Sequence, residues 1–133
     1  MNPERIKEAA AIFEKTGFVW VATADDKGIP HISIAKKLTV ESDNMVNLTE
    51  WFCPGTVNNI DKNPAISIVS WDKNTNTGHQ LIGTVINIKE VGMQDGFTGE
   101  SKPAETPQVE REFDVKVEYI LEFKNAPHRD KAE

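Results

Sequence analysis

Turn-forming residues divide this chain into six short segments that are rich in β-branched and aromatic residues. Such segments favour extended strands, and the Gly, Pro, Asn and Asp clusters between them favour tight turns. The segments cover residues 18–23, 29–40, 45–52, 65–71, 81–91 and 113–123. Short strands that follow one another with turns between them are typical of a closed or partly open antiparallel barrel. The sequence therefore predicts a mainly β fold.

The apolar pattern within each segment predicts which strand faces are buried. Residues 18–23 form an apolar run without alternation, so we expect both faces of that strand to be buried. Residues 29–40 alternate instead, and the turn at residues 25–28 joins the two segments into a hairpin. One face of the second strand is expected to carry Ile32, Ile34, Leu38 and Val40, and the other His31, Ser33, Ala35 and Lys37.

Two helices are predicted beside the strands. Residues 3–15 have apolar side chains at helical spacing, Asn2 can cap this helix, and Gly17 ends it. The second helix is shorter and follows the third strand, with Thr56 as its expected N-terminal cap. It ends before Pro64, because the residue before a proline avoids the helical region.

The rest of the chain predicts connections rather than further domains. Residues 92–112 are rich in glycine, proline and polar residues, so we expect a loop or an insertion with one short helix near residues 106–112. Residues 125–133 form a charged tail. With 133 residues and no internal repeat, the chain is expected to be a single domain over residues 1–133.

Charge and cysteine content argue against several classes of function. The formal net charge is -6 and no basic run is present, so we expect no nucleic-acid partner. Cys53 is the only cysteine, and the histidines have no metal-ligand spacing, so neither a disulfide nor a metal site is expected. No signal peptide or membrane-spanning segment is recognisable, which predicts a cytoplasmic protein without a membrane partner.

Four local patterns narrow the fold further by their order and spacing. They are residues 22–31 (ATADDKGIPH), 32–38 (ISIAKKL), 56–65 (TVNNIDKNPA) and 80–85 (QLIGTV). Together they resemble the pyridoxamine 5'-phosphate oxidase-like flavoproteins over residues 5–91, and more loosely over the last strand. The resemblance implies a six-stranded antiparallel split β-barrel with an N-terminal helix and a short helix after the third strand. It also implies a homodimer that holds FMN in the groove between its two subunits.

The resemblance places the flavin phosphate at the start of the second helix. The family has a threonine or serine there, and Thr56 matches it. The Thr56 hydroxyl and the N–H groups of Val57 and Asn59 are expected to bind the phosphate at the positive end of the helix dipole. Lys36 or Lys37 would add positive charge. Taken without the resemblance, Thr56 is an ordinary helix cap and Asn59 a solvated residue.

The flavin ring is expected to lie along the second and third strands. Its polar edge would meet the backbone of Ser33, Ile34, Ala35 and Lys36, and its other side would meet Asn47, Thr49, Glu50 and Trp51. Gln80 matches a family glutamine and would hydrogen-bond the ribityl chain or the phosphate, from either subunit. Trp51 has core or dimer packing as its alternative role.

Two departures from the family argue against vitamin B6 oxidation. Ser33 stands where the true oxidases carry an arginine, and their arginine–histidine motif near the C-terminus is missing. We therefore expect an FMN-binding flavoprotein that acts as an oxidoreductase or electron-transfer protein on a small-molecule or nicotinamide partner. No catalytic side chain is identified. The alternatives are a non-catalytic flavin- or deazaflavin-binding module and a structural dimer with an empty groove.

Overall fold

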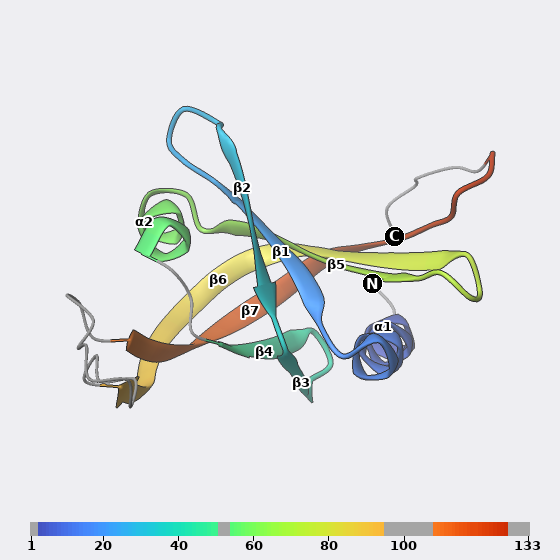
Figure 1. The fold of residues 1–133 in the computed structure, drawn as a ribbon, viewed down its shortest axis with the longest axis horizontal. Coiled ribbons are helices and arrows are strands. Elements are labelled where there is room, and N and C mark those ends of the chain that lie inside the picture. Colours follow the sequence, from blue (N-terminus) through green and yellow to red (C-terminus); the bar gives the residue numbers. More distant parts are fainter. Residues whose placement is uncertain (1–2, 51–53, 95–107, 128–133) are drawn as a thin grey trace, which may run out of the picture.

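The structure, a computed structural model, describes residues 3–50, 54–94 and 108–127, which form one antiparallel sheet and two helices (Figure 1). In chain order the elements are α1 (Pro3–Thr16), β1 (Val19–Ala24), β2 (Pro30–Ala35), β3 (Lys37–Ser42), β4 (Met45–Glu50), α2 (Pro54–Lys62), β5 (Ala65–Asp72), β6 (Thr77–Gln94) and β7 (Gln108–Phe123). The mainly β fold, the N-terminal helix and the short helix after residue 50 confirm the prediction.

The sheet curls so that the end of one edge strand and the start of the other meet at one corner. Its strand order is β2-β1-β5-β6-β7-β4-β3. The edge strands β2 and β3 are separated only by Lys36, and β2 contacts β4 across this corner. Away from the corner the edges diverge, and α1 packs against β3, β5 and β6 (Figure 1). The result is a barrel that is closed at one corner and open along one side, as the split-barrel prediction requires.

The described part of the sheet has seven strands instead of the predicted six, because the chain bends at Lys36. The bend also changes which residues face the core. Ala35 is fully buried at the end of β2, whereas Leu38 and Val40 pack against the core from β3. Ile32, which was expected to share a face with Leu38, is 62% exposed. A continuous strand would keep one alternation, but a bend resets the phase between its two halves.

Only one face of β1 is buried, which corrects the prediction for residues 18–23. Val19, Val21 and Thr23 point into the barrel, and Trp20 on the other face is 41% exposed. Phe18 lies beside Trp20 with its ring edge-on, at a centroid distance of 5.4 Å. The apolar run has no alternation because the outer face of this strand is also apolar, not because both faces are covered within one chain.

Strands β6 and β7 form a long hairpin that reaches into the segment predicted as a loop. β6 has 18 residues and β7 has 16, and their pairing extends to Gln94 opposite Gln108. The predicted short helix near residues 106–112 is therefore wrong from Gln108 onward, and residues 95–107 lie outside the described part. Charged residues hide the strand pattern there, and cross-strand pairing overrides the weak local preference.

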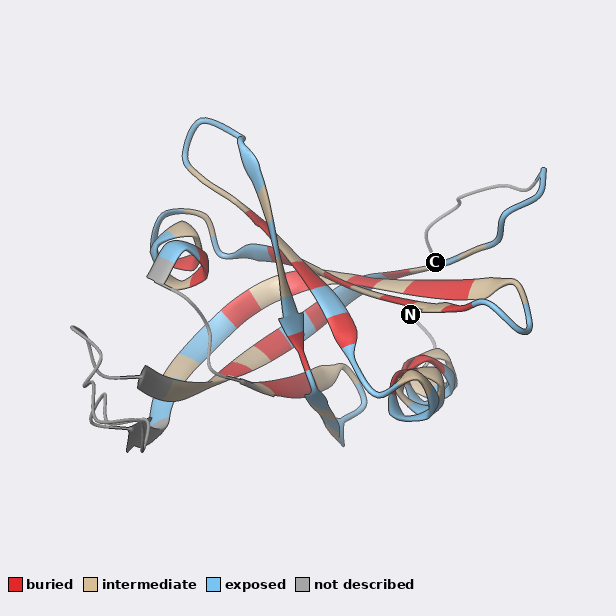
Figure 2. Cartoon of the chain, viewed as in Figure 1, coloured by how far each residue is buried: buried red, intermediate tan, exposed pale blue. Residues whose placement is uncertain are grey.

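Helix α1 covers the open side of the barrel with the face predicted from its spacing. Ile6, Ala9 and Phe13 are buried against the sheet, and each large side chain contributes about 1.5–3 kcal/mol by burial. Gly17 ends the helix in the left-handed region, at φ 85°, and its N–H donates to the Phe13 carbonyl. Buried residues gather on the inner faces of the strands and of α1 (Figure 2). Neither described helix is long and apolar enough to cross a bilayer.

Candidate functional site

The start of α2 differs from the predicted phosphate site. The helix begins at Pro54, so Thr56 is its third residue and not its N-terminal cap. Proline suits a first helical turn because its missing N–H has no helical partner to lose. The open N–H groups of the first turn are then those of Gly55 and Thr56, one turn earlier than Asn59. The Thr56 side chain is fully buried, so it faces the barrel.

The predicted contacts further along α2 are engaged with the barrel wall. Asn59 Nδ2 donates a hydrogen bond of 3.1 Å to Thr23 Oγ1 on β1, and Val57 packs against the hydrophobic core. Asn59 is half-buried by this contact, which corrects its description as a solvated residue. These contacts fix α2 against the hairpin of β1 and β2, where the predicted ring-binding backbone also lies.

Ser33 on β2 has a buried hydroxyl that lacks a partner. Its Oγ is inaccessible to solvent, and no described residue hydrogen-bonds to it. A buried hydroxyl without a partner costs about 1–3 kcal/mol, so this hydroxyl is a candidate for hydrogen bonding to a bound ligand or water. The strand itself is at the edge of the sheet and pairs only with β1 among the described strands. Backbone groups on its other side therefore face away from the sheet, as hydrogen bonding to a ligand would require.

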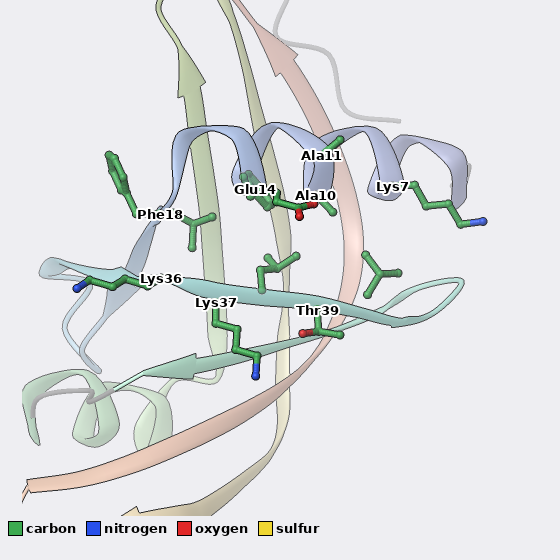
Figure 3. Close-up of a pocket in the computed structure, with 12 residues that line it drawn as sticks. Lys7, Ala10, Ala11, Glu14, Phe18, Lys36, Lys37 and Thr39 are labelled. Atoms are coloured by element: carbon green, nitrogen blue, oxygen red, sulfur yellow. The ribbon is translucent and has the colours of Figure 1, made fainter.

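A groove of about 540 Å³ lies between α1 and the start of β3 (Figure 3). Phe18 and Lys36 lie at one end and Lys7 at the other, with Glu14 between them, while Lys37 points away from the helix. Of the predicted binding residues, this groove contains only Lys36 and Lys37. Its floor is apolar and its rim is mixed in charge, so by itself it does not form the predicted phosphate site.

Asn47 and Thr49 on β4 belong to a polar network that the sequence did not reveal. Asn47 Nδ2 donates to Asp114 Oδ1 at 3.0 Å, and Thr49 Oγ1 donates to Asn47 Oδ1 at 3.0 Å. The hydrogen bond from Asn47 lowers the pKa of Asp114. A hydrogen bond with Asp114 raises the pKa of Glu41. When the two carboxyl groups share one proton, Glu41 therefore keeps it to a higher pH than Asp114 does. The network lines a depression of about 190 Å³ on the side of β3, β4 and β7 that points away from the core.

Two predicted residues next to this network cannot be assessed in the same way. Trp51 lies outside the described residues. For Glu50 the structure describes the backbone, which pairs with Arg111 of β7. Asp114 itself was missed because it occupies an outward polar position of an alternating strand, where a carboxylate is ordinary. Its hydrogen bonds with side chains of the neighbouring strands, Asn47 first among them, distinguish it.

Gln80 lies on β6 in an apolar outer face that spans five strands. Its Nε2 donates a hydrogen bond of 2.7 Å to Ser67 Oγ on β5. The strand register places two rows on this face, Ile34–Trp20–Val69–Gln80–Leu121 and Ile32–Ala22–Ser67–Ile82–Tyr119. We call these ten residues the outer face. A hollow of about 240 Å³ is lined in part by its Ala22, Ser67 and Ile82.

The outer face is too apolar for a surface that only meets water. Trp20, Ile34 and Tyr119 are 41%, 44% and 50% exposed, and Ile32 is 62% exposed. Scattered exposed apolar side chains are normal, but a contiguous group of large ones marks an interaction surface. Trp20 and Ala22 were not expected on this surface, because residues 18–23 were predicted to be buried on both faces of their strand.

No group of three or more His, Cys, Asp or Glu side chains in the described ranges is placed to hold a metal ion. His79 is buried, but it lies under α1 on the core side of β6, away from Gln80 on the outer side. Among the described residues, the candidate ligand contacts are the edge backbone of β2, the Ser33 hydroxyl, the two lysines at the corner and the outer face with Gln80.

The chain was compared with known families and structures. A family model described as pyridoxamine 5'-phosphate oxidase matches residues 6–124. HupZ from Group A Streptococcus is 22% identical, with a TM-score of 0.64 over 92% of this chain and 97% of that chain. A Clostridium acetobutylicum protein related to general stress protein 26 of Bacillus subtilis is 18% identical, with a TM-score of 0.64 over 94% and 92%.

A third similar structure is a pyridoxamine 5'-phosphate oxidase-related, FMN-binding protein from Nostoc punctiforme. It is 12% identical, with a TM-score of 0.66 over 93% of this chain and 86% of that chain. No curated protein sequence matches the chain. The structural likenesses, at such low identity, show a shared fold. The family model spans most of the chain, from the first helix to the end of the last strand, and the chain therefore belongs to the pyridoxamine 5'-phosphate oxidase family.

Proposed function

We propose that this protein binds FMN and works as a homodimer, with each flavin at the seam between two copies of the chain. The observation that carries the proposal is the position of β2. It is an edge strand, so its backbone near Ser33 and Ile34 can hydrogen-bond a ligand, and it borders the apolar outer face. An isoalloxazine ring needs both features, a row of backbone donors and acceptors for its polar edge and an apolar surface for its body.

The residues present fit an FMN molecule in several ways. Ser33 offers a hydroxyl that has no partner in the described chain, and α2, which packs against the same hairpin, offers the N–H groups of its first turn. Lys36 and Lys37 lie at the corner that follows β2 and supply positive charge for a phosphate. Gln80, fixed by Ser67, is positioned on the outer face to meet a flavin held by the partner subunit.

Bound FMN would supply electron or hydride transfer, so the chain need not contribute an acid or base. The residues of the chain would bind the phosphate, orient the ring and exclude water from it at the apolar seam. We propose an oxidoreductase or electron-transfer role with a small molecule or a nicotinamide as the partner. Flavin binding and turnover need separate tests, because a non-catalytic module would bind the same flavin without transferring electrons.

The first test is a titration of the purified protein with FMN, followed by flavin fluorescence and by light scattering. The proposal expects saturable binding, one flavin per chain and a mass twice that of the 14.9 kDa chain. A monomer that binds no flavin would contradict it. Stopped-flow reduction of the loaded protein by NADH or NADPH then distinguishes an oxidoreductase from a module that only stores or senses flavin.

A further inference from the structure

His79 is buried beneath α1 although its side chain is able to carry a charge. It is 3% exposed and lies on β6 between Ser70 of β5 and Glu122 of β7. Its Nδ1 and the Ser70 Oγ are both buried, and no described residue hydrogen-bonds to either atom. Burial without a hydrogen-bond partner favours the neutral imidazole, since a buried charge costs far more than a buried neutral ring.

The charges around His79 come from α1 and β7. Its Nε2 lies 3.9 Å from Glu122 Oε2, and Arg5 Nη2 of α1 lies 3.2 Å from that same oxygen. Arg5 Nε lies 3.6 Å from Glu8, also on α1. Arg5, Glu8 and Glu122 are therefore the charged groups that face the imidazole, while β5 contributes the neutral Ser70. A proton on His79 would place a second cation beside Arg5, at a carboxylate that Arg5 already binds.

We propose that His79 is an acid-sensitive latch for α1: uptake of a proton by His79 releases the first turns of α1 from the sheet and opens the groove between α1 and β3. Release of α1 would open the groove because Lys7, Ala10 and Ala11 of α1 form one of its walls. The far end of α1 is held separately by Lys15 Nζ, 2.8 Å from Asp72 Oδ2. The release therefore begins at the N-terminal half.

The direction of the pH effect follows from burial. Burial lowers the pKa of His79, and the nearby Glu122 only partly offsets this. In the released state the ring meets water and its pKa returns to about 6.5. The docked state thus binds the proton less well, so docking is strongest above pH of about 6.5 and weakens as the pH falls through that value. Each further pH unit favours the released state by about tenfold until the docked pKa is reached.

The ion pair between Lys15 and Asp72, at the far end of α1, remains charged within this window. Lys15 lowers the pKa of Asp72 through its hydrogen bond, so this carboxylate stays ionised at mildly acid pH. The ordinary pKa of a glutamate side chain, about 4.3, also lies below this window. A change between pH of about 5 and 7 is therefore attributable to a histidine and not to the loss of these ion pairs.

The test is amide hydrogen exchange of α1 in the full chain, measured by NMR between pH 5 and 7.5 and corrected for the intrinsic rate. We expect the protection of the Ile6 and Ala9 amides to fall about tenfold per pH unit below about 6.5. His79→Gln should remove this slope, and His31→Gln, a control on β2 away from α1, should keep it. Protection that does not depend on pH, or an equal slope in His79→Gln, would overturn the latch.

A second measurement needs no variant. The imidazole of His79 can be titrated by NMR in the intact protein. A pKa below that of an unburied histidine, with changes in the α1 resonances over the same pH range, is the expected result. A pKa at or above about 6.5, or a titration that leaves the α1 resonances in place, would show that the proton enters without moving the helix.

Discussion

The two edge strands of the sheet, β2 and β3, are consecutive in the chain but meet their surroundings in opposite ways. The outer positions of β2 hold Ile32 and Ile34, which are 62% and 44% exposed. The outer positions of β3 hold Lys37, Thr39 and Glu41, and its pairing with β4 is irregular after Val40. Charges and irregular pairing are how sheet edges avoid adding another strand. The comparison teaches that β3 ends the sheet, whereas β2 keeps an apolar exposed side, which the proposed dimer would cover.

The largest expected effect comes from placing a charge on the apolar edge. Ile34→Asp should convert the dimer to a monomer and weaken FMN binding by at least about 100-fold, or about 2.7 kcal/mol, because a carboxylate cannot be desolvated at the seam. Light scattering and FMN fluorescence titration measure the two effects. Because Ile34 is exposed in the single chain, the circular dichroism of the variant should be unchanged.

The same charge on the other edge is the matched control. Thr39→Asp on β3 should leave both the mass and the flavin affinity unchanged, since that face already carries charges. If Thr39→Asp separated the subunits as well as Ile34→Asp does, the two edges would not differ in the way that their exposed side chains indicate.

The core side of β3 should show the next largest effect. Leu38 packs against the core from β3, so Leu38→Ala should lower the free energy of unfolding by about 2 kcal/mol. Thr39 is the next residue and lies on the solvent-facing side of β3, so Thr39→Ala should change the free energy of unfolding by less than about 0.5 kcal/mol. Urea unfolding of both variants measures the difference. Equal losses would show that the phase of β3 set by the bend at Lys36 is wrong.

Ser33 separates ligand binding from stability on β2. Ser33→Ala removes the unpartnered hydroxyl, so the free energy of unfolding of the flavin-free protein should stay unchanged or rise by up to about 1 kcal/mol. Flavin affinity should fall by about tenfold if this hydroxyl binds FMN. A loss of stability without a loss of affinity would mean that the hydroxyl has a partner other than the flavin.

The polar network beside β3 gives the smallest effect, with a defined pH dependence. Asn47→Ala should raise the pKa of Asp114 and cost up to about 1 kcal/mol at neutral pH, because Asp114 loses its main hydrogen bond. A lowered pKa stabilises the fold above the ordinary aspartate pKa of about 3.9, and this contribution is lost as pH falls. The difference between variant and parent should therefore shrink in acid.

Glu41 opposes this trend, because its pKa is raised in the folded protein. Its contribution to stability is present below the ordinary glutamate pKa and is lost as the pH rises. The control is Asn87→Ala, because Asn87 Nδ2 makes a longer and exposed hydrogen bond of 3.3 Å to Asp114. Urea unfolding at two pH values and NMR titration of the Asp114 carboxylate measure both variants. A larger effect from Asn87 than from Asn47 would contradict the assigned order.

Local chemistry explains why much of the fold was predictable. The turn after β1 is an example: the Asp25 carboxylate accepts hydrogen bonds of 2.8 Å from the N–H groups of Lys27 and Ile29, and Gly28 has a positive φ of 85°. The spacing of Ile6, Ala9 and Phe13 likewise determined the buried face of α1. These features depend on residues that are neighbours in the sequence, so the sequence shows them directly.

The features that were missed depend on contacts between distant segments. The bend at Lys36 changes the phase of the strand only because β2 and β3 pair with different strands. The burial of Thr56 and the contact of Asn59 with Thr23 follow from the docking of α2 on β1, which no local pattern encodes. An apolar residue such as Trp20 suits the core of one chain and a seam between two subunits equally well. The sequence alone does not distinguish these two environments.

The position of β7 between β6 and β4 has a consequence for how the chain assembles during synthesis. Among the described strands β4 pairs with β3 and β7, and Met45 lies opposite Lys116. The second edge of β4 therefore stays unpaired until β7 has been synthesised. A ribosome-bound chain that ends before β7 therefore exposes β4 and β6 as unpaired edges. Pairings of such large sequence separation form late, because loop closure precedes the contacts that stabilise them. Until the last strand has emerged, the nascent sheet therefore has two more unpaired edges than the folded protein.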